Sequence, residues 1–232
     1  ADSAQRAGDE FSGGADAVGR VCRRPAGQLL EFGTGAGGDG AGLGGGSSDA
    51  ATTLVALNAL WGLGLEADEL AALGLQLGAD VPVCLAGRAT FMAGIGEELS
   101  AAPALPPAWL VLVNPGVGVS TPVVFARRSG SFNAPARFDG VPRDAEELAT
   151  LLTARNNDLT SSALSLLPVI GDVLKALGQT NGNLLSRMTG SGATCFGLYA
   201  EEETAGEAAA ILSRDHPQWW VEATPIGTGE FR

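Results

Sequence analysis

A run of glycines directly before an apolar segment constrains this chain more than any other feature of its sequence. Residues 40–52 read GAGLGGGSSDAAT, and apolar residues then recur near helical spacing until Gly62 and Gly64. Glycines let backbone N–H groups converge on an anion without side-chain clashes, and a helix N-terminus adds about half a positive charge. The stretch predicts either a phosphate-binding loop or a flexible loop before an ordinary helix. In both cases we expect Ser47 or Ser48 as the N-cap and Asp49 in the first turn.

Two other phosphate-binding motifs fit this sequence poorly. A P-loop needs a lysine directly after its glycines, and none stands there. The segment GTGAGG, residues 33–38, has the glycine spacing of a dinucleotide-binding fingerprint. Neither a following helix nor an acidic residue about 20 positions further on supports that interpretation.

Composition and charge exclude several classes of protein. A chain of 232 residues that is 45% hydrophobic can form one large or two modest domains, and its net charge of −12 argues against binding nucleic acid. We expect no membrane span, because no apolar run reaches about 18 residues. Cys22, Cys84 and Cys195 form no CxxC pair, which argues against zinc and fits the reducing cytoplasm. His216 is the only histidine, and we do not expect it to be a catalytic base.

The order of the expected elements predicts an α+β fold. Residues 1–39 show no sustained periodicity, so we expect them to be irregular and leave them unassigned. Pro82 favours an extended conformation of Val81. The proline-rich segment 102–109 suggests a domain junction. We expect helices over 67–77, 120–127, 144–154, 160–177 with a break at Pro168, and 201–215. We expect strands over 90–93, 109–115 and 219–227, and two more on either side of a glycine turn within 184–200.

Three motifs, GLGGGSSDA, LGADVP and TGSGA, follow one another in an order that resembles the GHMP kinases, a superfamily of small-molecule kinases. The longer stretches NPGVGVSTPVVFA, NDLTSSA and MTGSGATCFGLYA are similar to its cytidine-specific branch, and the resemblance covers about residues 40–226. It implies a two-domain α+β fold with the active site in the cleft between the domains. Residues 40–108 would be part of the N-terminal ATP-binding domain, and 109–232 the sandwich-like C-terminal domain.

The resemblance also implies roles for individual residues. Asp80 would accept the proton of the substrate hydroxyl; otherwise it is a turn-forming residue. Thr121 and Phe125 would contact the cytosine base; otherwise they pack a helix. Gly190, Ser191 and Gly192 would lie near phosphates or substrate; otherwise they form a hairpin turn. The loop that would bind the phosphates of ATP, with the two serines near Mg²⁺, consists of Gly40, Ala41, Gly42, Leu43, Gly44, Gly45, Gly46, Ser47 and Ser48. The resemblance implies no protein side chain as a metal ligand.

The branch phosphorylates the 2-hydroxyl of 4-diphosphocytidyl-2-C-methyl-D-erythritol with ATP, in non-mevalonate isoprenoid biosynthesis. The resemblance therefore implies a cytoplasmic enzyme, monomeric or homodimeric, with a small-molecule substrate. The family's opening PAKINL-type motif, which supplies a lysine beside the catalytic aspartate, is absent here, and no lysine precedes Lys175. We therefore expect that the family's N-terminal part is missing or replaced. An inactive or nucleotide-binding remnant, or another GHMP kinase, is the alternative, although GVSTPVVFA disfavours the latter.

Overall fold

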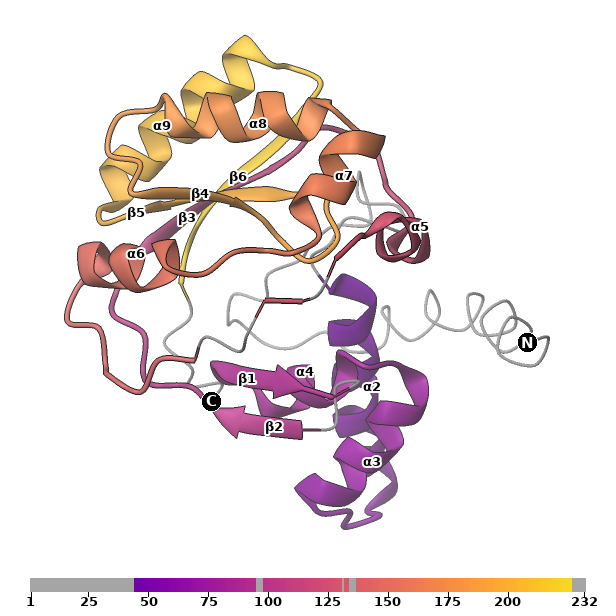
Figure 1. Ribbon diagram of the computed structural model, residues 1–232. Coiled ribbons are helices and arrows are strands. Elements are labelled where there is room, and N and C mark those ends of the chain that lie inside the picture. Colours follow the sequence, from indigo (N-terminus) through magenta and orange to yellow (C-terminus); the bar gives the residue numbers. More distant parts are fainter. Residues whose placement is uncertain (1–43, 95–97, 131, 134–136, 227–232) are drawn as a thin grey trace. The chain divides into compact units, whose positions relative to one another are not determined.

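The computed structural model describes residues 44–94, 98–130, 132–133 and 137–226 (Figure 1). These residues form two compact units, one within 44–101 and one within 102–226, and each is described by itself. The predictions for residues 1–43, including the GTGAGG segment and Cys22, lie outside the described residues. Among the described residues, every helix is too short or too polar to cross a lipid bilayer.

The first unit consists of three helices and a two-stranded antiparallel sheet. Its elements are α2 (Gly45–Trp61), α3 (Ala67–Leu77), α4 (Val81–Ala86), β1 (Thr90–Ala93) and β2 (Glu98–Ala101). α4 packs against both α2 and α3. The close approach of α3 and α4 requires a glycine, because a Cβ at Gly74 would lie 2.9 Å from Cγ1 of Val81. The predicted α3 and β1 are confirmed, whereas β2 was not predicted.

The expectation of an extended Val81 is wrong. Val81 is the first residue of α4, and Pro82 occupies the second helical position, where both are buried. A proline in the first turn of a helix removes no intrahelical hydrogen bond, since the first N–H groups have no acceptor there. The steric bias of a residue before proline is therefore overridden by the packing of α4.

The second unit is built on a four-stranded antiparallel sheet in the order β4-β5-β3-β6. Its strands are β3 (Trp109–Asn114), β4 (Leu185–Met188), β5 (Cys195–Tyr199) and β6 (Trp220–Pro225). β3 pairs with β5 on one side and with β6 on the other. This central position explains its continuous apolar sequence, since both faces of the strand are covered by protein. The strands predicted in this half of the chain are confirmed.

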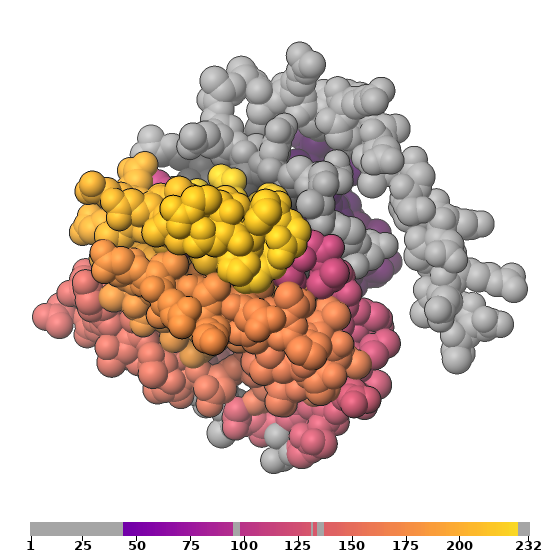
Figure 2. All heavy atoms as spheres, turned by 90° about the horizontal axis from the view of Figure 1, so that it is seen from above, coloured from indigo at the N-terminus to yellow at the C-terminus, as the bar shows by residue number. Residues whose placement is uncertain are grey.

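Helices cover both faces of this sheet (Figure 1). On one face, α8 and α9 bury Ile170, Val173 and Leu212 against Val111 and Val113. Figure 2 looks onto this side, where the two helices form the outer surface in orange and yellow. On the other face, α6 packs Leu148 against Leu198 of β5. The helices of the unit are α5 (Thr121–Arg127), α6 (Ala145–Thr153), α7 (Thr160–Leu166), α8 (Val169–Gly178) and α9 (Glu202–Asp215). The predicted break at Pro168 separates α7 from α8.

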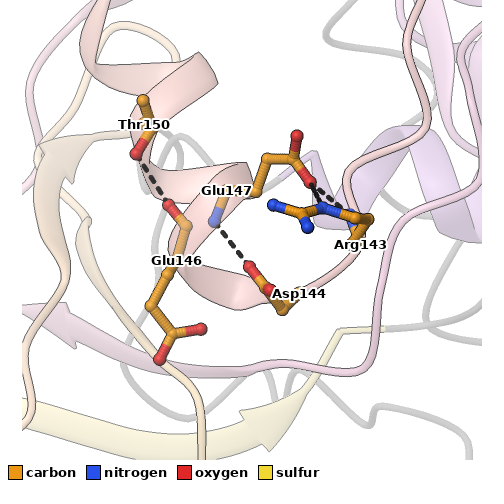
Figure 3. A network of polar contacts seen from close by, with 5 residues as sticks. All are labelled: Arg143, Asp144, Glu146, Glu147 and Thr150. Carbon is orange, nitrogen blue, oxygen red and sulfur yellow. Dashed lines mark hydrogen bonds and ion pairs between the residues drawn. The ribbon is translucent and has the colours of Figure 1, made fainter.

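The start of α6 shows how local sequence fixes a helix end (Figure 3). The Asp144 carboxylate accepts a hydrogen bond of 2.8 Å from the Glu147 N–H, which makes Asp144 the N-cap. Glu147 in turn accepts from the backbone N–H of Arg143 and from its guanidinium, at 2.8 and 2.9 Å. These bonds, the backbone one first, lower the pKa of Glu147. Because both side chains are exposed, the ion pair itself adds little stability.

Candidate functional site

The glycine run opens α2 in a different way from the one predicted. Gly44 is the N-cap, with a left-handed φ of 67°, and the helix begins at Gly45. Ser48 already donates its N–H to the Gly44 carbonyl at 2.9 Å, and no side chain caps the helix. Ser47 and Ser48 as N-caps, and Asp49 in the first turn, are therefore wrong. Glycine adopts a left-handed φ without strain, so the helix can begin before the serines.

The start of α2 leaves room for an anion. A Cβ added at Gly44, Gly45 or Gly46 would meet no atom of the described residues within 4 Å. The first N–H groups of a helix have no intrahelical acceptor, and they carry the positive end of the helix dipole. Open space before such donors is the arrangement that phosphate groups bind in proteins. The predicted loop residues 40–43 lie outside the described residues.

Asp80 lies on the predicted turn, between the end of α3 and the start of α4. Its side chain is exposed and makes no capping hydrogen bond, so the carboxylate is accessible. Its backbone carbonyl accepts from the N–H of Cys84 at 3.2 Å. Burial, and then the negative charge of Asp80, raise the pKa of the Cys84 thiol. Among the described residues of this first unit, Arg88 is the single basic side chain.

The structure brings together two predicted substrate residues of the second unit. The Thr121 hydroxyl, at the start of α5, lies 2.7 Å from the Ser191 hydroxyl in the turn between β4 and β5. Ser191 is buried, whereas Thr121 is exposed. Phe125 follows Thr121 by one helical turn, on the same face of α5, and is 50% exposed. The buried residue of α5 is Val124, so half of the Phe125 side chain remains available to a ligand.

The turn that carries Ser191 requires its glycines. Gly190 and Gly192 have φ values of 46° and 87°, in the left-handed region that side chains disfavour. A Cβ at Gly192 would also lie 2.9 Å from Sδ of Met188. Gly192 donates to the Thr189 carbonyl at 2.9 Å, and Thr189 donates to that of Thr194 at the same distance. The turn is therefore tightly folded and places Ser191 at one defined position.

Two asparagines that support this turn were not singled out from the sequence. Asn114, at the end of β3, donates to the hydroxyl of Thr194 at 2.9 Å. Asn157, before α7, donates to the carbonyls of Met188 and Gly190. Asn157 is the first residue of NDLTSSA, a motif that is similar to the family. This similarity alone did not indicate a role for the asparagine.

Two further reactive side chains, His216 and Cys195, are engaged in packing. The ring of His216 stacks on that of Trp219, with centroids 3.7 Å apart. Burial raises the pKa of the Cys195 thiol to about 12. Among the described residues, His, Cys, Asp and Glu form no group of three or more that could hold a metal ion.

Comparison with known families agrees with the fold and the motifs. The model of the GHMP kinases N terminal domain matches residues 35–88, and that of the GHMP kinases C terminal domain matches residues 136–218. A solved homoserine kinase from Cytophaga hutchinsonii has the same fold, with a TM-score of 0.68 at 18% identity, over 83% of this chain and 67% of that one. The chain belongs to the GHMP kinases.

Within this family the chain is similar to enzymes named 4-diphosphocytidyl-2-C-methyl-D-erythritol kinase. It is 56% identical to that of Paramagnetospirillum magneticum over 78% of this chain and 64% of the relative. It is 50% identical to that of Rhodospirillum rubrum, over 79% of this chain and 60% of the relative. A solved 4-(cytidine 5'-diphospho)-2C-methyl-D-erythritol kinase is 36% identical, with a TM-score of 0.62, over 82% of this chain and 68% of that one. The chain thus spans less than two thirds of the length of these two curated relatives.

Proposed function

We propose that this protein transfers the γ-phosphoryl group of ATP to the 2-hydroxyl of 4-diphosphocytidyl-2-C-methyl-D-erythritol. The observation that carries the proposal is the identity of 56% and 50% to two relatives named as that kinase. The site residues add chemical support, since a bare helix start, an accessible carboxylate and an exposed aromatic ring are the groups this reaction needs. The enzyme would act in the cytoplasm, in isoprenoid precursor synthesis.

The glycine loop and the start of α2 would hold the phosphates of ATP. No atom of the described residues lies within 4 Å of a Cβ placed on Gly45 or Gly46, so these residues leave room for phosphate oxygens at the first N–H groups of the helix. Ser47 and Ser48 lie in the first turn and can add hydroxyl donors, because neither caps the helix. When bound, Mg²⁺ would neutralise charge on the phosphates and orient them for transfer.

Asp80 would accept the proton of the 2-hydroxyl as that oxygen attacks phosphorus. A general base must be accessible and hydrogen-bond directly to the proton it takes, and the Asp80 carboxylate is exposed and makes no capping bond. Its position after Gly78 and at the start of α4 fixes the backbone beside it. Phosphoryl transfer needs mainly positioning and charge stabilisation, so one carboxylate is sufficient as a base.

Thr121, Phe125 and the turn of Gly190, Ser191 and Gly192 would bind the cytidine end of the substrate. The ring of Phe125, half exposed on α5, is available to stack on a base. The Thr121 hydroxyl lies on the same face of the helix and can hydrogen-bond to the base edge. Its contact with Ser191 ties this face of α5 to the glycine turn.

The test is steady-state phosphoryl transfer with ATP and Mg²⁺, in which homoserine and mevalonate serve as competing acceptors. Asp80→Asn should lower turnover by at least ~10²-fold, on the scale of one lost transition-state interaction, while ATP still binds. Gly45→Val should abolish ATP binding without unfolding the protein, because the added side chain enters open space. Transfer to another acceptor, or unchanged ATP affinity of Gly45→Val by calorimetry, would contradict the proposal.

A second candidate is nucleotide binding with little or no transfer. The candidate concerns the 232 residues given, which contain no lysine before Lys175, whereas the resemblance implies one beside the catalytic aspartate. Turnover of the 232-residue chain should then be reduced by at least ~10²-fold, and a fused family N-terminal segment that carries the lysine should restore it. Full activity of the unmodified chain would exclude this candidate.

A further inference from the structure

Asn157 uses its whole side-chain amide to connect the start of α7 with the glycine turn. Its Nδ2 donates to the Gly190 carbonyl at 2.8 Å and to the Met188 carbonyl at 3.1 Å. Its Oδ1 accepts from the N–H of Leu159 at 2.9 Å. Leu159 is buried in the core of the second unit, so the asparagine is anchored on one side and holds the turn on the other.

These bonds fix the direction of the peptide that links Gly190 to Ser191. In a planar trans peptide the C=O and N–H bonds point in opposite directions. Because the Gly190 carbonyl faces Asn157, the Ser191 N–H points away from Asn157. Among the described residues, no acceptor takes a hydrogen bond from that N–H. The side chain of the same residue meets Thr121 at 2.7 Å.

We propose that Asn157 is a positioning residue for substrate. By holding the Gly190–Ser191 peptide, it keeps the Ser191 N–H available for an acceptor oxygen of the substrate and keeps the Ser191 hydroxyl against Thr121. The ligand class is the cytidine diphosphate portion of the proposed substrate, so the inference rests on the proposed function. Asn157 itself need not touch the ligand.

The chemistry of the three bonds requires an amide. Among side chains of this length, only that of asparagine has an NH₂ group with two donors for two carbonyls and an oxygen that accepts from a backbone N–H. Aspartate has the same shape and keeps the bond to Leu159, but its carboxylate cannot donate to either carbonyl. Two carbonyls facing a carboxylate also favour its protonated form, which restores one donor.

The experiment measures binding of CDP by calorimetry, together with the Ser191 and Gly190 amide signals by NMR in the free protein. Asn157→Asp should weaken CDP binding by ~10-fold or more at pH 8 and shift both amide signals, because small displacements at a binding turn have large effects. The difference in CDP affinity between the variant and the wild type should become smaller as pH falls, because the introduced carboxyl takes up a proton. A merely structural defect would instead appear as a loss of folded protein, which the NMR spectrum of the free protein reports.

Asn183→Ala is the matched control. Asn183 lies just before β4, where it donates to the Leu185 carbonyl at 3.3 Å and accepts from Ser186, far along the hairpin from Ser191. It should leave CDP affinity and the two amide signals unchanged. Wild-type CDP affinity in Asn157→Asp, or equal losses in both variants, would overturn the inference. Failure of the wild-type protein to bind CDP would instead overturn the proposed cytidine site, and the inference with it.

Discussion

The two units of this protein bury their side chains to very different extents. In the second unit helices cover both faces of a four-stranded sheet, and all but one of the largest fully buried side chains belong to it; Val81 is the exception. In the first unit, α2 leaves Val55, Leu60 and Trp61 between 51% and 74% exposed. The predicted substrate residues therefore belong to a unit with an extensive buried core, whereas the predicted phosphate loop precedes a helix with few buried side chains.

The largest expected effect tests this contrast in packing. Leu177→Ala, in the core between α8 and the sheet, should lower the free energy of unfolding by about 2–5 kcal/mol, because a buried leucine loses its contacts and leaves a cavity. Leu60→Ala, where the side chain is 74% exposed, should change it by less than about 0.5 kcal/mol. Urea denaturation followed by circular dichroism measures both. Similar losses would show that the two units are packed alike.

The next prediction concerns ligand binding on the second unit. Phe125→Ala should weaken CDP binding by about 1–3 kcal/mol, the range for stacking of one base, while ATP affinity remains unchanged. Phe132→Ala is the control, because that ring is also exposed but lies 3.5 Å from the Arg128 guanidinium. Calorimetry with CDP and with ATP measures both affinities for each variant. A parallel loss of both affinities would make Phe125 a structural residue.

The N-terminus of α6, in the second unit, is capped by a side chain, whereas that of α2, in the first unit, is not. Asp144→Ala should lower stability by about 1 kcal/mol, because it removes the cap of α6. Ser47→Ala should change it by less than about 0.5 kcal/mol, since the N-cap Gly44 has no side chain that bonds to the start of α2. Thermal denaturation of both variants checks the order. A larger effect at Ser47 would mean that its hydroxyl does bond to the start of α2.

The smallest expected effect concerns the thiols of Cys84 and Cys195, the two cysteines among the described residues. Cys84 in the first unit should react with iodoacetamide faster than Cys195, whose pKa burial raises to about 12. Asp80→Asn should increase the rate at Cys84 by less than about tenfold at pH 8, because removal of the negative charge lowers the thiol pKa and raises the thiolate fraction. Peptide-level mass spectrometry follows each cysteine separately. A slower reaction would contradict the assigned role of the Asp80 charge.

Elements with a strong local pattern could be predicted from the sequence. The helix at 67–77 and the strand at 109–114 follow from periodicity and a continuous apolar run, and Pro168 marks a true break. The start of α2 was not predictable in the same way, because a glycine N-cap has no side-chain signal that competes with two serines. β2 is short, with one charged and one polar residue in its four, and becomes a strand through its pairing with β1.

The candidate site was predicted as separate residues, not as an arrangement. Sequence motifs indicated Thr121 and Ser191, but their contact at 2.7 Å joins residues far apart in the chain. Asn157 illustrates the same limit, since its role depends on carbonyls of a distant turn. Hydrogen bonds between distant segments depend on the fold, and no local pattern encodes them.

The pairing of β3 with β6 has a consequence for synthesis of the protein. Trp109 is paired with Pro225, so the first and last strands of the second unit lie side by side. During translation, β3 leaves the ribosome long before β6, and one edge of it stays without its partner until the end of the unit emerges. Contacts this distant in sequence also slow folding. Ribosome-bound chains that stop before residue 220 should therefore hold an incomplete sheet, with an exposed strand edge open to chaperones.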